Sequence, residues 1–163
     1  MKKNVVLAVF ALFLLATATT SSQKPQTEKV GDPLRYVNAA GLATPPGYSH
    51  AVVVERGKII YVSGQVGLNA KGEMPSDFRG EVTQAFQNLR TVLTAAGSSP
   101  SNVVKINFYV VGLNREKLAV VREARDAFID KNRAPASTLA GAAALFREDC
   151  HIEIEAVAVV ANF

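Results

Sequence analysis

The sequence predicts an α+β fold in which two helices pack on one face of a mixed β-sheet. Two observations predict it. Extended and helical segments follow one another in the order strand, strand, helix, strand, helix, strand, strand. Both helical segments also carry their apolar residues on one side only, so each must cover a sheet with that side. The 163 residues are enough for one domain with a hydrophobic core.

The first 18 residues have the organisation of a secretory signal peptide. Lys2 and Lys3 precede an apolar run over residues 5–16, and small residues at positions 16–18 offer a cleavage site. The run is short for a membrane span, and an uncleaved N-terminal anchor is the alternative reading. We therefore expect a periplasmic or secreted protein that leaves the membrane after cleavage. A flexible polar leader follows over residues 19–33, and then one domain over residues 34–163.

Charge and cysteine content bear on the partners to expect. Cleavage at this site removes two lysines and lowers the formal charge from +4 to +2, a value that gives no reason to expect a nucleic-acid partner. Cys150 is the only cysteine, so the chain has no internal disulfide. We expect no metal, because Cys150 and His151 point to opposite sides of a strand and His50 is the only other histidine.

The first half of the domain reads as short strands. Residues 35–37 form a candidate strand. Residues 52–55 and 58–63 flank Arg56-Gly57, which favours a hairpin. The second of these strands is apolar enough to be buried on both faces. Gly64, which follows it, indicates a β-bulge or a close approach to the backbone.

The first helix is the clearest element of the sequence. Ser76 or Asp77 can cap its start, and Gly97 can close its end. Its apolar residues recur at steps of three and four and make one stripe: Phe78, Val82, Phe86, Leu89, Leu93 and Ala96.

A second helix is expected to begin after Asn114 and to end before Pro135. Leu118, Val121, Phe128 and Ile129 mark its buried side, whereas Glu116, Lys117, Arg122 and Arg125 are expected to be more exposed.

The strands of the second half alternate clearly. Along residues 103–111, Val104, Ile106, Phe108 and Val110 should face one way and Lys105, Asn107 and Tyr109 the other. Residues 138–145 are an extended segment of small residues, and residues 151–160 alternate again. The sheet face away from the helices carries Tyr109, Val157 and Val159 beside charges. That face is too apolar to be left in water, so we expect the chain to self-associate.

Several short segments, in this order and at these separations, resemble the RidA family. This family of reactive intermediate deaminases is also called the YjgF family and is often labelled L-PSP endoribonuclease. The likeness covers residues 42–160, and the segments that carry it are Tyr48-Ser49-His50-Ala51-Val52, Ser63-Gly64-Gln65, Ala96-Gly97, Val103-Val104-Lys105 and Glu153-Ile154-Glu155-Ala156-Val157-Ala158.

The resemblance implies a chorismate-mutase-like subunit in a homotrimer whose sheets form a central barrel. Small-molecule ligands then bind in clefts between neighbouring subunits. In active members an enamine or imine, such as 2-aminoacrylate, is hydrolysed to a 2-keto acid and ammonia, without a cofactor or metal.

The resemblance also assigns roles to residues of this chain. Glu153 corresponds to the glutamate that orders the attacking water, although an exposed polar strand residue is the alternative reading. Tyr48 corresponds to a tyrosine of the cleft. Ser63, Gly64 and Gln65 match the strand motif beside it, where Gly64 can also serve packing alone.

One position departs from the family pattern. The deaminases carry an arginine directly after Pro-Ala, where it grips the substrate carboxylate, and this chain has Ser137. A serine hydroxyl can donate one hydrogen bond, whereas a guanidinium makes a charged two-point contact. Arg133 and Arg147 are the nearby replacements to consider, and a solvated surface arginine is the alternative for Arg133. His50 stands where many members have glutamine, and it can be a titrating cleft residue or an ordinary surface histidine.

Three functions are compatible with these residues. The first is an imine or enamine deaminase whose activity is altered or reduced by Ser137. The alternative is a non-catalytic trimer of the same fold that binds a small ligand. A ribonuclease ranks last, because the sequence has neither a pair of catalytic histidines nor an aromatic and basic surface run.

Overall fold

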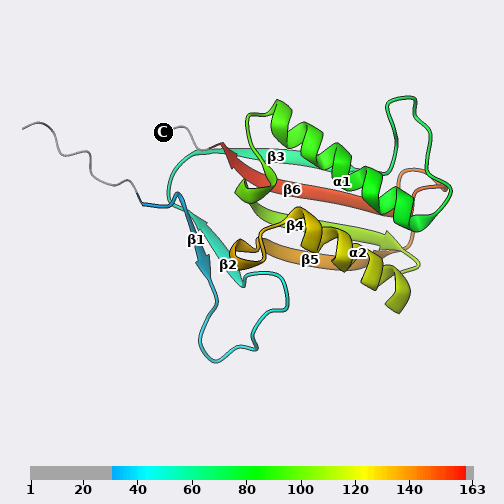
Figure 1. Ribbon diagram of the computed structural model, residues 1–163. Helices are drawn as coiled ribbons and strands as arrows, with labels where there is room; N and C mark the ends of the chain where they lie inside the picture. The colour runs from blue at the N-terminus through cyan, green and yellow to red at the C-terminus, as the bar shows by residue number, and fades with distance from the viewer. Residues whose placement is uncertain (1–30, 161–163) are drawn as a thin grey trace, which may run out of the picture. The chain divides into compact units, whose positions relative to one another are not determined.

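The computed structural model describes residues 31–160 (Figure 1). The chain divides into two units, residues 1–31 and residues 32–163, and the second contains all the helices and strands of the described residues. The predicted signal peptide and residues 19–30 of the predicted leader lie outside the described residues, so both remain predictions. Within the described part, no helix combines the length and the apolar character needed to cross a membrane.

The second unit is built from a mixed sheet and two helices. The four-stranded sheet has the order β3-β6-β4-β5, in which β4 and β5 are parallel and the other pairs antiparallel. The helices lie across one face of this sheet (Figure 1). The predicted α+β fold with both helices on one face is therefore confirmed. The elements are β1 (Leu34–Val37), β2 (Ala51–Val54), β3 (Lys58–Gln65), α1 (Phe78–Ala95), η1 (Pro100–Asn102), β4 (Val103–Val111), α2 (Arg115–Phe128), η2 (Lys131–Arg133), β5 (Ala136–Ala142) and β6 (Ile152–Val160).

Both helices begin where the sequence predicts, and α1 also ends there, but α2 ends at Phe128, earlier than the expected stop at Asn132 and Pro135. Asp77 caps α1 by accepting a hydrogen bond from the amide of Gly80 at 2.8 Å, and Asn114 caps α2 by accepting one from the amide of Lys117 at 2.9 Å. Gly97 has φ +75° just after α1, a conformation that glycine adopts at little cost. Four residues of the predicted α1 stripe are buried against the sheet: Val82, Phe86, Leu89 and Leu93.

The predicted hairpin between the second and third strands is wrong. β2 pairs with β1, in a separate two-stranded sheet, and β3 pairs with β6. The local pattern could not show this, because β1 replaces β3 as the partner of β2. β1 is held in place by its apolar residue Leu34, which is buried against β4 and β6. As an edge strand, β3 is also not buried on both faces: Ile59 is 50% exposed and Tyr61 is 82% exposed.

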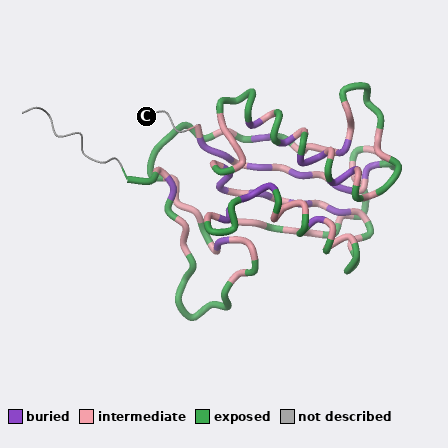
Figure 2. Tube along the Cα trace, viewed as in Figure 1, coloured by how far each residue is buried: buried purple, intermediate pink, exposed green. Residues whose placement is uncertain are grey.

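A register shift in β4 changes which of its residues face the helices. The shift falls between Val103 and Lys105, so Val103 joins the main core under the helices. Val104, which was expected to share a face with Ile106, instead packs with Leu34 and Val159 on the opposite side. Beyond the shift, buried and less buried residues alternate along β4 and β6 (Figure 2). The small β1–β2 sheet thus covers part of the face that we expected to be open.

Candidate functional site

The bulge in β3 brings Gly64 into direct contact with Glu153. The pairing of β3 with β6 shifts register between Val62 and Gln65, so the predicted bulge is confirmed. A β-carbon on Gly64 would lie 1.6 Å from Oε1 of Glu153, which means that the carboxylate rests on the glycine backbone. The absence of a side chain at position 64 is therefore what makes room for Glu153.

The neighbours of Gly64 complete this corner of the sheet. The side-chain amide of Gln65 turns back and donates to the backbone carbonyls of Ser63, at 3.2 Å, and of Gly64, at 3.3 Å. The hydroxyl-bearing side chain of Ser63 is exposed beside them. Ser63, Gly64, Gln65 and Glu153, which the sequence singled out together, thus lie together in the structure.

The two glutamates of β6 differ in what they bind. Glu155 accepts hydrogen bonds from Nδ2 of Asn107 at 2.6 Å and from the hydroxyl of Tyr109 at 2.9 Å. The hydrogen bond to Glu155 raises the pKa of Tyr109 above its ordinary value. Glu153, by contrast, makes no hydrogen bond or ion pair with any residue in the range 31–160. Its carboxylate is therefore free to accept a hydrogen bond from water or a ligand.

The buried carboxylate of Glu81 fixes the start of β6. Glu81, 2% exposed, accepts hydrogen bonds from the amides of His151 at 2.5 Å and Ile152 at 3.1 Å, and its other oxygen lies 3.1 Å from Nδ1 of His151. Glu81 also lies in the first turn of α1, where a negative charge suits the positive end of the helix. Its place three residues after Phe78, on the apolar stripe, was the available signal of burial.

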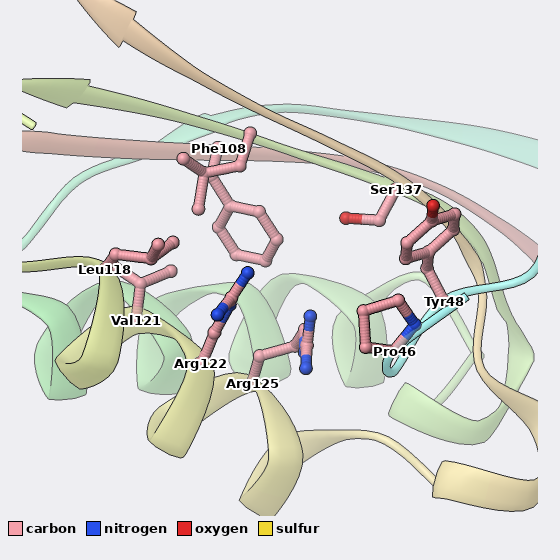
Figure 3. A pocket seen from close by; sticks show the side chains of 9 residues that line it. Pro46, Tyr48, Phe108, Leu118, Val121, Arg122, Arg125 and Ser137 are labelled. Carbon is pink, nitrogen blue, oxygen red and sulfur yellow. The ribbon is translucent and has the colours of Figure 1, made fainter. Parts of the chain in front are cut away.

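Tyr48 and Ser137 line a different space. They share a cavity of about 130 Å³ between β5, α2 and the turn before β2 (Figure 3). Its floor is apolar, and the polar groups that reach it are the two hydroxyls and two guanidinium groups from α2. The remaining lining residues are Pro46, Phe108, Leu118, Val121, Arg122, Arg125 and Leu139.

Ser49, which the sequence analysis did not single out, holds the two predicted residues together. Its amide donates to the carbonyl of Pro135 at 3.0 Å, and its hydroxyl donates to the carbonyl of Ala134 at 2.7 Å. The side chain is buried. Because Ser49 follows Tyr48 and its partners directly precede β5, these bonds fix Tyr48 against the strand that carries Ser137.

Arg122 and Arg125 were expected on the exposed side of α2, and this is wrong in part. The side chain of Arg125 is only 12% exposed, and both arginines point from α2 into the cavity (Figure 3). They follow Leu118 at steps of four and seven residues, the spacing of one helix face. That spacing from a residue predicted to be buried was the signal that could have placed them.

Arg125 is occupied by contacts within the chain. Its Nε and one terminal nitrogen both donate to Oδ1 of Asp126, at 3.0 and 2.7 Å. Partial burial raises the pKa of Asp126, but the hydrogen bond and charge of Arg125 outweigh it and hold this pKa below its ordinary value. The same guanidinium fills the space beside Gly47, where a β-carbon would lie 2.3 Å from it.

The two arginines considered as replacements at the sequence level lie elsewhere. Arg133 pairs with Asp32 at 2.9 Å and stacks over the ring of Tyr36 at 5.5 Å, and Arg147 pairs with Asp149 at 2.5 Å. Neither lines the cavity of Ser137. Among the described residues, no group of three or more His, Cys, Asp and Glu side chains is arranged to hold a metal ion.

His50 serves the loop that precedes β2. Its Nδ1 accepts a hydrogen bond from the amide of Ala39 at 3.1 Å, and its own amide donates to Oδ1 of Asn38 at 3.0 Å. The ring also meets that of Tyr48 edge-on, with centroids 6.3 Å apart. Of the two readings, the contacts favour a residue that supports the loop and touches the cavity only through Tyr48.

The two groups of site residues lie on opposite faces of the sheet. Ser137 is paired with Ile106, which is fully buried under the helices, whereas Glu153 is paired with Tyr109 on the other face. β4 separates β5 from β6. The cavity of Ser137 is accordingly not lined by Glu153, and within one chain the two groups cannot contact the same small molecule.

The chain was compared with known families and proteins. The family model described as endoribonuclease L-PSP matches residues 39–160. The chain is similar to a 2-iminobutanoate/2-iminopropanoate deaminase from Dermatophagoides farinae, with 33% identity over 78% of this chain and 98% of the relative. A protein of the same name from Escherichia coli K12 is 36% identical over 65% of this chain and 83% of the relative.

Solved structures show the same likeness. The Rid-family protein YyfB from Yersinia pestis, described as of unknown function, superposes with a TM-score of 0.71 and 32% identity, over 78% of this chain and 99% of that chain. Escherichia coli TdcF, solved with bound serine, gives a TM-score of 0.56 and 28% identity, over 72% and 90%. The range that the family model matches, residues 39–160, contains both groups of site residues.

Proposed function

This chain belongs to the endoribonuclease L-PSP family, the RidA or YjgF family, and we propose that it hydrolyses a reactive imine or enamine to a carbonyl compound and ammonia. The names of the two deaminases above support this reaction class. The observation in this chain that carries the proposal is the carboxylate of Glu153, which lies on the backbone of Gly64 with no partner among the described residues.

The chemistry needs one base that can hold a water molecule. An enamine first takes up a proton at carbon and becomes an iminium ion. Water then adds to the iminium carbon, and Glu153 accepts the proton that the water loses. Glu153 returns this proton to the nitrogen of the resulting carbinolamine. The C–N bond then breaks and ammonia leaves, while the hydroxyl group loses its proton to water as the C=O bond forms, which balances the proton taken up in the first step. Glu155 cannot take this part as easily, because Asn107 and Tyr109 already occupy its carboxylate.

The complete cleft is proposed to lie between copies of the chain. Glu153 and the cavity of Ser137 occupy opposite faces of one sheet, so one substrate can reach both only if a neighbouring copy supplies one of them. The exposed Ile59 and Tyr61 beside the bulge give the open face an apolar surface that a neighbour can cover. A homotrimer satisfies both requirements. A mature protein that is active as a strict monomer in light scattering would contradict this.

Ser137 in place of an arginine is proposed to change how the substrate is held. The hydroxyl offers one hydrogen bond in the cavity instead of a charged two-point contact. Binding without turnover is the alternative function, and the experiment below separates it from catalysis.

The test is hydrolysis of 2-iminobutyrate and of a neutral imine by the wild-type protein, with ammonia release as the readout. Glu153→Gln is expected to lower kcat about 10²- to 10⁴-fold, the usual contribution of a general base. Glu116→Gln, an exposed change on α2, serves as the matched control and should have wild-type activity. A wild-type protein inactive on both imines contradicts the proposal. If Ser137→Arg then restores turnover, the cleft is intact and the binding function takes precedence.

Export from the cytoplasm is a further part of the proposal, and it rests on residues 1–18 alone. The mass of the protein isolated from its native cells tests it. Removal of the first 18 residues supports a periplasmic or secreted protein, and a full-length mass contradicts it.

A further inference from the structure

We infer that Arg122 supplies the positive charge that Ser137 lacks, so that the cavity binds substrates bearing a carboxylate group. This rests on the proposed function in naming the molecule as a small imino acid. Ser137 alone offers a carboxylate one hydrogen bond and no charge. The structure places a cation at the same cavity from the facing helix.

The charge balance of the cavity favours an anion. Its lining includes Arg122 and Arg125 and no acidic residue. The adjoining cleft, which shares Pro46 and both arginines with the cavity, adds Gly47, Lys131 and Asp126. Asp126 is the single carboxylate among these residues, and it is already bonded to Arg125 and lies 3.4 Å from Lys131. The entrance is therefore positively charged.

Arg122 is the cation that remains available. In the described part of the chain it takes part in no ion pair or hydrogen bond, whereas two of the nitrogens of Arg125 are committed to Asp126. Arg122 is also an exposed residue, and its end points into the cavity that Ser137 lines (Figure 3). An arginine in this position can bind a carboxylate with two parallel hydrogen bonds at no cost to an existing contact.

The hydroxyl groups opposite α2 complete a carboxylate site. Tyr48 and Ser137 can each donate one hydrogen bond, and Ser49 holds them in place from behind. The small side chain of Ser137 also leaves the cavity open to a guanidinium that enters from α2. The apolar floor formed by Phe108, Leu118 and Leu139 suits a short hydrocarbon chain. At about 130 Å³, the space is smaller than the roughly 300 to 1,000 Å³ clefts of drug-sized ligands, so the substrate is small.

The test measures binding separately from turnover. 2-Oxobutyrate, a stable keto acid, and its neutral amide are titrated into the oligomeric protein by calorimetry. Arg122→Gln is expected to weaken 2-oxobutyrate binding about 10- to 100-fold, the usual effect of losing a charged hydrogen-bonding partner, and to leave binding of the amide unchanged. Arg122→Lys should recover part of the affinity, since it restores the charge without the two-point geometry.

Arg115→Gln is the matched control, because it removes an exposed arginine from the same helix outside the cavity. It should bind 2-oxobutyrate like the wild type. Equal affinities of the wild type and Arg122→Gln would overturn the inference, and so would a wild-type protein that prefers the amide or binds neither compound.

Kinetics with 2-iminobutyrate separates this inference from the proposed function. If both hold, Arg122→Gln raises KM by the same factor and changes kcat much less. If 2-oxobutyrate binding depends on Arg122 but the protein does not hydrolyse 2-iminobutyrate, only the deaminase proposal is contradicted. If the protein hydrolyses 2-iminobutyrate and Arg122→Gln leaves its KM unchanged, only the inference about Arg122 is contradicted.

Discussion

The two halves of the proposed cleft are built in different ways. At the β3–β6 corner, the position of Glu153 depends on backbone features, namely the bulge, the bare Gly64 and the register of β6. In the cavity between β5 and α2, the lining consists of side chains from a turn, two strands and a helix. A backbone-built site tolerates few changes, whereas a side-chain-built site can exchange one residue for another on a neighbouring element. The corner with Glu153 therefore suits a reaction that stays the same, and the cavity with Ser137 suits a substrate that can differ between relatives.

Among the variants that test this comparison, Gly64→Ala is expected to have the largest effect on activity. The three atoms nearest to the new methyl group all belong to the side chain of Glu153, with Oε1 at 1.6 Å, so the carboxylate must move while the fold remains. We expect imine hydrolysis to fall about 10²-fold or more. The free energy of unfolding should change by less than about 1 kcal/mol, as measured by urea denaturation.

Gly67→Ala provides the contrast within the same part of the chain. Its methyl group would meet the backbone oxygen of Glu81 at 2.8 Å and its Cα at 2.9 Å, which cannot move aside as a side chain does. This variant should lose about 1–3 kcal/mol of stability. If Gly64→Ala were as unstable as Gly67→Ala but retained activity, the position of Glu153 would not depend on the bare backbone of Gly64, which would contradict our explanation of this corner.

An intermediate effect is expected from Ser49→Ala. The change leaves the buried carbonyl of Ala134 without its 2.7 Å donor, which costs about 1–3 kcal/mol of unfolding free energy. Because Ser49 ties Tyr48 to the strand of Ser137, the KM for 2-iminobutyrate should rise more than kcat falls. Urea denaturation and steady-state kinetics check the two parts. A fall in kcat alone would mean that Ser49 supports the β3–β6 corner with Glu153 and not the cavity of Ser137.

The smallest effect concerns Tyr109 on the open face. Because its hydroxyl donates to Glu155, the pKa of Tyr109 is raised in the folded protein. The stabilisation is present below the ordinary tyrosine pKa of about 10 and is lost as the pH rises through the higher folded value. Absorbance titration near 295 nm, with Tyr109→Phe as the reference, should show a lower pKa in Glu155→Gln. An unchanged pKa would mean that Glu155 does not hold Tyr109.

The sequence predicted most of what depends on a local pattern. The helix limits follow from Asp77, Asn114 and Gly97, and the bulge follows from a glycine inside a strand. It could not predict the pairing of β2 with β1, because that choice depends on Leu34 finding a place against distant strands. The same limit explains the cavity. A missing arginine at position 137 is visible in the sequence, but its proposed replacement lies on α2, and only the fold shows which elements face each other.

The proposed division of the site between copies of the chain can be tested directly by co-assembly of two variants. Glu153→Gln removes the base from one kind of chain, and Ser137→Phe fills the cavity of the other with a ring. Each variant alone should be inactive. When the two are refolded together, about one quarter of the clefts should pair an intact Glu153 with an intact cavity, so activity should return to about a quarter of the wild-type value. A mixture no more active than its separate components would contradict a cleft shared between chains.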